Sequence, residues 1–259
     1  MGRKEKISGL LITLNEEKHI EAVLQNLSFC DEIIVVDSFS TDRTIEIIKQ
    51  HKNVQLIQRP FKNYTDQKQF ALDQASFNWV LFMDADERVT PNLKKEILNE
   101  IEHATDPAAA YFFLRIFMYK NKILRFSGWQ TDKNYRLFQK DKVKFVSDRI
   151  VHETLDVNGE SKTLSNRLIH YSFNSYEEYK AKMVKYGKMK AKESFDSGKK
   201  ARWYHSVLRP SWRFFNHYIL RLGFLDGKKG IIISYLNALG VYIRFKELKR
   251  LNSVPNNEK

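Results

Sequence analysis

The sequence has a single cysteine, Cys30, which excludes an intrachain disulfide bond and is compatible with a reducing compartment. Stability must therefore come from a packed core, and a chain of 259 residues is long enough to bury one. Hydrophobic residues make up 42% of the chain and aromatic residues 13%, which is typical of a folded protein rather than a disordered one. We expect one large domain, or one domain with an appendage.

Long hydrophobic runs are also missing. No stretch reaches the roughly 18 apolar residues of a membrane-spanning helix. Residues 1–6 are basic, but no separate apolar segment with a small-residue cleavage site follows them, so we expect no signal peptide. Lys6 stands where a myristoylation signal has Ser or Thr. We expect a cytoplasmic protein.

Acidic residues are scarce in one part of the chain only. Between Lys180 and Arg250 there are 18 Lys and Arg residues but 4 Asp and Glu residues, whereas the rest of the chain has 26 basic and 27 acidic residues. The formal net charge of +13 therefore comes from the C-terminal region. Such a region favours an anionic partner, which is a membrane surface, a phosphorylated glycolipid or a nucleic acid.

What the sequence does contain is a run of large apolar residues, Trp79–Met83, that leads directly into the carboxylates Asp84, Asp86 and Glu87. The apolar run is typical of a strand buried on both faces. In open parallel α/β sheets, ligands bind at the carboxyl ends of the strands. Asp84 and Asp86 would point the same way on an extended chain, and two carboxylates suit a hard divalent cation such as Mg²⁺ or Mn²⁺. A solvated acidic turn is the alternative interpretation of these residues alone.

Strand-like and helix-like segments alternate along the first 105 residues, which predicts parallel β-α-β units. Three predicted strands end at Asn15, Asp37 and Asp84, so these polar side chains should gather at one edge of the sheet. The predicted strands are 8–14, 32–37, 53–59 and 79–83, and the predicted helices are 16–27, 40–50, 64–75 and 90–101.

After Pro107 the pattern changes to mixed or antiparallel strands, followed by helices. Segment 230–251 has an apolar centre framed by Lys and Arg, which fits a helix lying in a membrane interface; a helix packed on the catalytic domain is the alternative. The other predicted elements are strands in 108–119 and 123–126, a hairpin of 135–138 with 143–146, a turn at Asn158-Gly159 and a basic helix at 175–197.

Four short motifs occur in an order and spacing that resemble family 2 glycosyltransferases with the GT-A fold. They are Leu14-Asn15-Glu16-Glu17, then residues 35–42, then Gln67-Lys68-Gln69, then Met83-Asp84-Ala85-Asp86-Glu87. The resemblance continues through 136–138 and 151–153, covers most of the chain, and points to the branch with bacterial lipopolysaccharide-core β-glucosyltransferases. One departure is Ser38-Phe39, where many members have an acid followed by Gly or Ser. We expect it to alter the loop around the nucleobase.

The resemblance implies an α/β fold of the GT-A type, with a Rossmann-like, mostly parallel sheet flanked by helices and a helical basic C-terminal extension. We expect a catalytic domain at 1–172, made of a nucleotide-sugar-binding half (1–105) and an acceptor half (106–172), and an extension at 173–259. The implied activity is hexosyl transfer, with inversion, of a sugar such as glucose from a UDP-sugar to a lipid-linked or cell-envelope glycan.

Such a transfer needs a bound sugar nucleotide and a neutralised diphosphate leaving group, which is the work of a metal ion. We expect Asp86 to be the direct ligand of Mg²⁺ or Mn²⁺, and Asp84 either to share the metal or to contact the ribose. The resemblance implies that Asp37 meets the nucleobase. The other candidates are Thr13, Asn15 and Glu17 for the nucleotide pocket, and Lys68 for the diphosphate.

The transfer also needs a carboxylate within hydrogen-bond reach of the acceptor hydroxyl as general base. We favour Glu153, which stands beside His152, with Asp132 second and Asp148 as a further candidate. His152 or His170 would add a metal ligand, although a lone histidine is more often structural. Two residues have equal alternatives: Arg136 contacts phosphate or sugar, or forms a buried ion pair, and Trp129 stacks on a sugar ring or joins the core.

The expected partners are a UDP-sugar, a glycan or glycolipid acceptor and the inner-membrane surface, with peripheral attachment at its cytoplasmic face. A basic nucleic-acid-binding protein is an alternative, but the sequence has no zinc-ligand spacing or RNA-binding signature, so we expect no nucleic-acid partner. A nucleotidyltransferase with the same metal–carboxylate site is a second alternative. The oligomeric state is not predicted.

Overall fold

The computed structural model describes residues 5–129, 131–147, 153–173 and 175–253, without the side chains of Ser147, Glu153, Thr154 and Phe173. The chain divides into two compact units. The first unit comprises the described parts of Met1–Arg115 and Asp132–His170, and the second unit those of Ile116–Thr131 and Tyr171–Lys259. Segment 116–131, expected within the acceptor half, belongs to the second unit.

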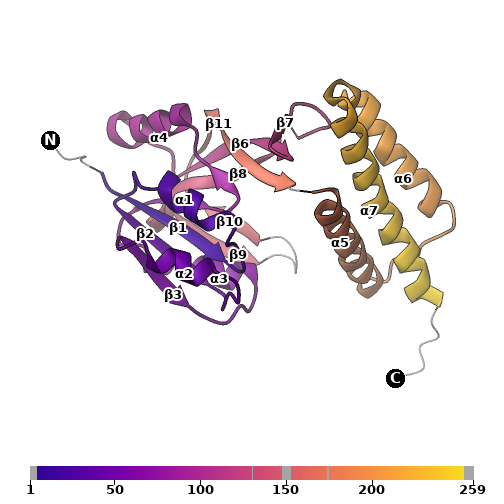
Figure 1. Ribbon diagram of the computed structural model, residues 1–259, viewed down its shortest axis with the longest axis horizontal. Helices are drawn as coiled ribbons and strands as arrows, with labels where there is room; N and C mark the ends of the chain where they lie inside the picture. Colours follow the sequence, from indigo (N-terminus) through magenta and orange to yellow (C-terminus); the bar gives the residue numbers. More distant parts are fainter. Residues whose placement is uncertain (1–4, 130, 148–152, 174, 254–259) are drawn as a thin grey trace. The chain divides into compact units, whose positions relative to one another are not determined.

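The first unit is built on a mixed sheet with the strand order β3-β2-β1-β4-β8-β6-β11-β5 (Figure 1). Strands β1 to β4 run parallel, β8 is antiparallel to both β4 and β6, and β11 is antiparallel to β5. The predicted α/β sheet, with its parallel half first, is confirmed. The strands are β1 (Ile7–Thr13), β2 (Glu32–Asp37), β3 (Val54–Gln58), β4 (Trp79–Met83), β5 (Glu87–Arg88), β6 (Ala110–Tyr119), β8 (Lys133–Gln139) and β11 (Ser161–Phe173).

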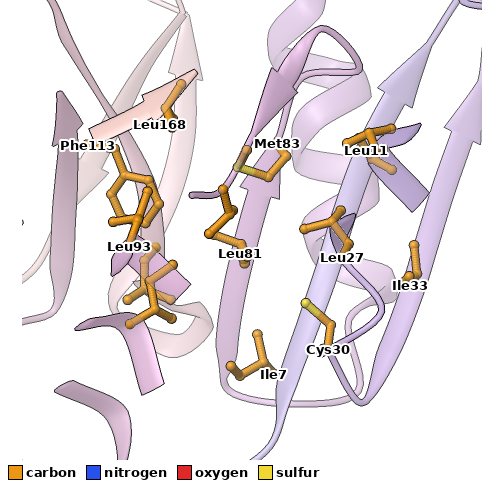
Figure 2. Close-up of a cluster of buried hydrophobic side chains, with 14 of the residues drawn as sticks. Ile7, Leu11, Leu27, Cys30, Ile33, Leu81, Met83, Leu93, Phe113 and Leu168 are labelled. Carbon is orange, nitrogen blue, oxygen red and sulfur yellow. The ribbon is translucent and has the colours of Figure 1, made fainter. Parts of the chain in front are cut away.

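Helices cover both faces of this sheet. One core cluster packs α1, α2 and α4 against one face, and Figure 2 shows part of it. A second cluster packs α3 and two further strands, β9 and β10, against the other face. Because side chains alternate along a strand, Leu81 and Met83 of β4 enter the first cluster, while Val80 and Phe82 enter the second. The helices are α1 (Ile20–Asn26), α2 (Thr44–Lys49), α3 (Tyr64–Gln74) and α4 (Pro91–His103).

The ends of these helices follow local chemistry. Helix α4 begins where Thr90-Pro91 predicts, because the Thr90 hydroxyl accepts a hydrogen bond from Leu93 N at 3.3 Å. Helix α1 begins at Ile20, four residues later than predicted, because the chain turns after β1 with Asn15 at a φ of 57°. The residues between β1 and α1 therefore form a loop, and a loop at this position can line a site.

The hairpin predicted for 135–138 and 143–146 is wrong. Strand β8 stays in the main sheet, while β9 (Val143–Ser147) pairs with β10 (Glu153–Val157) in a separate two-stranded sheet. The connecting 3₁₀ turn, Lys140–Lys142, is anchored by Lys140 Nζ, which donates to the Ala75 carbonyl at 2.7 Å. The turn at Lys140–Lys142 thus connects a strand of the main sheet to a strand of the two-stranded sheet.

The second unit is mainly helical. Helices α5 (Tyr176–Asp196) and α6 (His205–Phe215) pack on α7 (Lys228–Ser253), and β7 (Lys122–Leu124) pairs with the end of β6. Ile233 and Leu236 of α7 are fully buried in a core with Tyr179 of α5. The face of α7 that carries Ile233 and Leu236 therefore forms the centre of this unit. Among the described residues, no helix combines the length and the hydropathy that a membrane span requires.

Candidate active site

The carboxyl ends of the parallel strands bring three predicted site residues to one edge of the sheet. Thr13 at the end of β1 is directly opposite Asp37 at the end of β2. Strand β4 lies on the other side of β1, with Met83 opposite Leu11, so Asp84 follows at the same edge. This edge is where ligands bind in open parallel sheets.

Asp37 is fully buried and serves as the centre of a hydrogen-bond network. Its Oδ1 accepts from the hydroxyl of Thr13 at 3.1 Å and from that of Ser40 at 2.5 Å. Its Oδ2 accepts from Ser40 N at 2.8 Å and from Gln58 Nε2 at 3.4 Å. Asp37 therefore fixes the loop that follows β2.

The loops after β1 and β2 are tied to each other. Asn15 Oδ1 accepts from Thr41 N at 2.8 Å, and Glu17 Oε2 accepts from Arg43 N at 3.2 Å. Between them, Phe39 adopts a φ of 61° and leaves 52% of its surface exposed. The unusual Ser38-Phe39 pair thus presents an aromatic ring to solvent in the loop after β2, which is hydrogen-bonded to the loop that carries Asn15 and Glu17.

A chain of alternating charges follows β4. Arg136 of β8 is buried and pairs with both Asp84 and Glu87, and its Nη2 donates to Glu87 Oε1 at 2.8 Å. Arg115 of β6 lies with Nη1 3.6 Å from the same Glu87 oxygen, and its Nε donates to Asp132 Oδ2 at 2.6 Å. The structure thus gives Arg136 the buried ion pair, one of the two roles considered from the sequence.

This charge chain controls the protonation of Asp84. Burial alone would raise the pKa of its carboxyl, but the positive charge of Arg136, followed by those of Lys68, His170 and Arg115, outweighs burial and holds the pKa well below its ordinary value. Asp84 is therefore ionised at neutral pH, and its side chain remains 37% exposed. It is a fixed negative charge with access to solvent.

Asp86 has a different partner. Its Oδ2 lies 3.1 Å from Nε2 of His170, which comes from β11 opposite Glu87. Asp84 and Asp86 are thus engaged by different side chains, Arg136 and His170. Within the described residues, no three His, Cys, Asp or Glu side chains are grouped to hold a metal ion. A Mg²⁺ or Mn²⁺ ion that is also bound by substrate phosphates and waters needs one or two protein ligands, and the Asp86 carboxylate beside an imidazole fits that need.

Lys68 of α3 is mostly buried, which is unusual for a lysine. Its ammonium group lies 5.7 Å from the centre of the Phe82 ring and 6.0 Å from that of Phe145, and its charge acts on Asp84. Lys68 is therefore not a lysine solvated on an exposed helix face.

The remaining predicted residues fall elsewhere. Asp148 and His152 lie outside the described residues, and of Glu153 only the backbone is described, opposite Ser147 at the start of β10. Trp129 belongs to the second unit, where its ring packs 4.5 Å from that of Phe117. Cys30 is a buried free thiol, which fits a role in core packing. Sequence reasoning missed Arg115, although one charge inside the apolar run 110–119 was a signal for a buried partner.

The family model and the curated relatives agree on one family. The model of "Glycosyl transferase family 2" matches residues 8–155. The lipopolysaccharide core biosynthesis glycosyltransferase LpsC of Rhizobium meliloti (strain 1021) is 29% identical over 93% of this chain and 93% of its own. A glycosyltransferase of Rickettsia felis is 31% identical over 95% of this chain and 90% of its own. Residues 1–349 of S. aureus TarS form a solved structure that is 16% identical over 92% of this chain and 91% of that chain, with a TM-score of 0.48.

Proposed function

The chain belongs to glycosyl transferase family 2, and on that premise we propose that it moves a hexose from a UDP-sugar to a lipid-linked or cell-envelope glycan, with inversion at the anomeric carbon. The observation that carries the proposal is the edge of the sheet where Asp37 ends β2 and where Asp84 and Asp86 follow β4. The name of the similar LpsC, a lipopolysaccharide core biosynthesis glycosyltransferase, supports an envelope acceptor.

The loops after β1 and β2 are the proposed nucleotide site. Asp37 would meet the nucleobase, and Thr13, Asn15 and Glu17 would line the pocket. The hydrogen bonds that join these loops support this role, because a preorganised pocket loses little entropy when it binds. UDP is the nucleotide that the resemblance of the sequence implies.

The residues after β4 are the proposed diphosphate site. A bound Mg²⁺ or Mn²⁺ would stabilise the charge that develops on the leaving diphosphate. We propose Asp86 as its protein ligand, with His170 beside it. Asp84 has two proposed roles, sharing the metal or accepting from the ribose hydroxyls, and its pairing with Arg136 favours the second. Lys68 would contact the diphosphate, because a mostly buried ammonium group near Asp84 suits an anion at this place.

Two carboxylates remain proposed as the general base. Glu153 is the first choice and Asp132 the second. The ion pair of Asp132 with Arg115 favours Glu153, because an acceptor hydroxyl would have to compete with the guanidinium for the Asp132 oxygens. The acceptor we propose is a glycan or glycolipid at the cytoplasmic face of the inner membrane, which the chain would reach as a peripheral protein.

The donor site can be tested by calorimetry of UDP and UDP-glucose binding with Mn²⁺, with Mg²⁺ and with EDTA. We expect metal-dependent binding by the wild type and its loss in Asp86→Ala, because the metal would lose its protein ligand. The matched control is Asp141→Ala, which removes an exposed carboxylate from the turn between β8 and β9 and should bind as the wild type does.

Two results would contradict the proposal. One is a folded wild type that binds neither UDP nor UDP-sugars with either metal. The other is unchanged metal-dependent binding by Asp86→Ala. If binding follows the expected pattern, turnover of Glu153→Gln and Asp132→Asn on a lipid-linked acceptor distinguishes the two candidate bases. Loss of kcat with unchanged donor affinity identifies the base.

A further inference from the structure

Helix α6 has no buried residue, although it packs on α7. Its large apolar side chains face solvent instead: Leu208 is 63% exposed, Trp212 60% and Phe215 44%. Ile219, in the π-helical turn that follows, is 41% exposed. The intervals of four, three and four residues place these side chains along one face of a helix.

The apolar surface extends beyond this face at both ends. Trp203, just before α6, is 71% exposed, and three apolar side chains follow in the 3₁₀ turn and its approach, namely Leu222, Phe224 and Leu225. The rings of Trp212 and Phe215 lie 5.9 Å apart. Exposed apolar side chains gathered along one short segment in this way mark a site of interaction with a protein or a membrane.

The charge of the same segment is one-sided. Residues 197–229 contain eight Lys and Arg residues and a single acid, Asp226. Asp226 is buried, and its two oxygens accept from the backbone N–H groups of Arg125 at 3.0 Å and Phe126 at 2.9 Å. The segment thus presents apolar and cationic side chains to solvent but no exposed carboxylate.

We propose that residues 203–225, together with the flanking cations, form a docking surface for an anionic phospholipid bilayer. The apolar side chains enter the boundary between headgroups and acyl chains, the two tryptophans lie at headgroup level, and the cations contact lipid phosphates. This inference rests on the proposed function in one respect: an enzyme with a lipid-linked acceptor has to reach the membrane surface. It assigns membrane contact to α6 and not to the apolar run of α7.

A second copy of the chain fits this surface less well. A symmetric dimer places the same patch of both chains face to face. Here that arrangement would bring together two cationic segments, 197–229 of each chain, and neither segment has an exposed carboxylate to neutralise the other, which is repulsive. An anionic lipid surface satisfies both the apolar and the cationic side chains.

The test is co-sedimentation of the full chain with vesicles of phosphatidylcholine alone, and with vesicles of equal parts phosphatidylcholine and phosphatidylglycerol. We expect binding to the anionic vesicles and weak binding to the neutral ones. The double variant Leu208→Ala/Trp212→Ala should weaken binding about tenfold or more, because it removes two apolar side chains from the interface. The matched control is Tyr235→Ala/Tyr242→Ala, which removes two exposed aromatic rings of α7 and should bind as the wild type does.

Charge is tested in the same way. Arg202→Gln/Lys228→Gln should weaken binding to anionic vesicles about fivefold for each charge removed. Lys142→Gln/Lys144→Gln removes the same charge from exposed positions of the first unit and should have little effect. Vesicles with bromine-labelled acyl chains should quench the fluorescence of the wild type, and Trp212→Phe should lose part of that quenching.

Three results would overturn the proposal. They are no binding to anionic vesicles, equal loss of binding in the α6 and α7 double variants, and a wild-type dimer in light scattering that Leu208→Ala/Trp212→Ala dissociates. Each variant must retain the circular dichroism of the wild type. UDP binding should be the same in all of them, so vesicle binding and donor binding can fail independently.

Discussion

The two units pair their positive charges in opposite ways. In the first unit, the guanidinium of Arg136 is enclosed between Asp84 and Glu87, and burial, which lowers its pKa, is outweighed by these carboxylates, so the pKa is raised. In the second unit, Arg213 lies with Nη1 3.2 Å from Nε2 of a buried histidine, His217. Burial, and then the charges of Arg213 and Arg221, lower the pKa of His217 to about 4.

The two arrangements of charge suit different roles. A buried cation with two carboxylate partners is neutralised within the protein, and it holds the sheet edge of the first unit in one geometry. Cations without carboxylates, beside a histidine kept neutral, leave a positive surface that an outside anion can neutralise. The first arrangement suits a preorganised site, and the second suits a partner.

The largest expected effect comes from unbalancing the charges of the first unit. Glu87→Gln keeps the shape of the side chain but leaves Arg136 and Arg115 without their shared anion, so the free energy of unfolding should fall by about 3–5 kcal/mol. A urea titration followed by circular dichroism measures this. Glu46→Gln removes one partner of an exposed pair with Arg43 and should change the value by less than about 1 kcal/mol. Equal losses in both variants would show that burial does not distinguish the two pairs.

The second unit should respond to pH through His217. Its folded-state pKa of about 4 lies below the ordinary value of 6.5, so between these values the unfolded chain binds more protons than the folded one. The contribution of His217 is therefore fully present above pH 6.5 and is lost as pH falls toward 4. Between pH 7.5 and 5, the wild type should lose about 2 kcal/mol of unfolding free energy through this residue.

The pH dependence can be assigned by substitution. His217→Gln should flatten the loss between neutral pH and pH 5, because glutamine does not titrate there. His103→Gln, at an exposed position at the end of α4, should leave the loss unchanged. If both variants flatten the curve equally, or neither does, the histidine of the second unit is not the group responsible.

Much of the first unit could be predicted from its sequence, because its signals are local. The strand Trp79–Met83 was predicted with its observed bounds, since an apolar run bounded by polar residues has few other structures. The cap at Thr90-Pro91 defined the start of α4 for the same reason. The hairpin failed because strand pairing is not local: β8 and β9 are separated by three residues, yet each finds its partner in a different sheet.

The ion pairs at the candidate site could not be predicted from the sequence for a related reason. The motif showed Asp84 and Asp86 two residues apart, which predicts a shared direction on an extended strand. Strand β4 ends at Met83, so the two carboxylates leave the strand and meet Arg136 and His170, residues far away in the sequence. Their partners depend on the order of β8 and β11 in the sheet, which no local pattern encodes.

The smallest expected effect tests how closely α5 and α7 pack in the second unit. A Cβ at Gly187 of α5 would lie 2.7 Å from the Gly240 carbonyl and 3.0 Å from Ile243 of α7, which is too close. A Cβ at Gly240 would meet only ordinary contacts with Met183, the nearest at 3.4 Å. Alanine gains about 1 kcal/mol over glycine in a helix. Gly187→Ala should therefore destabilise by about 1 kcal/mol net, because overpacking costs more than the gain.

Gly240→Ala is the matched substitution in the facing helix and should be neutral or stabilising, by up to about 1 kcal/mol. Thermal unfolding followed by circular dichroism at neutral pH, where His217 is neutral in both variants, separates helix packing from the charge effects described above. Opposite shifts of the two variants would show that close approach of α5 and α7 at Gly187 holds this unit together. Equal shifts would show that the two helices can move apart, and the stability of the unit would then have to come from the cluster around Ile233 and Leu236.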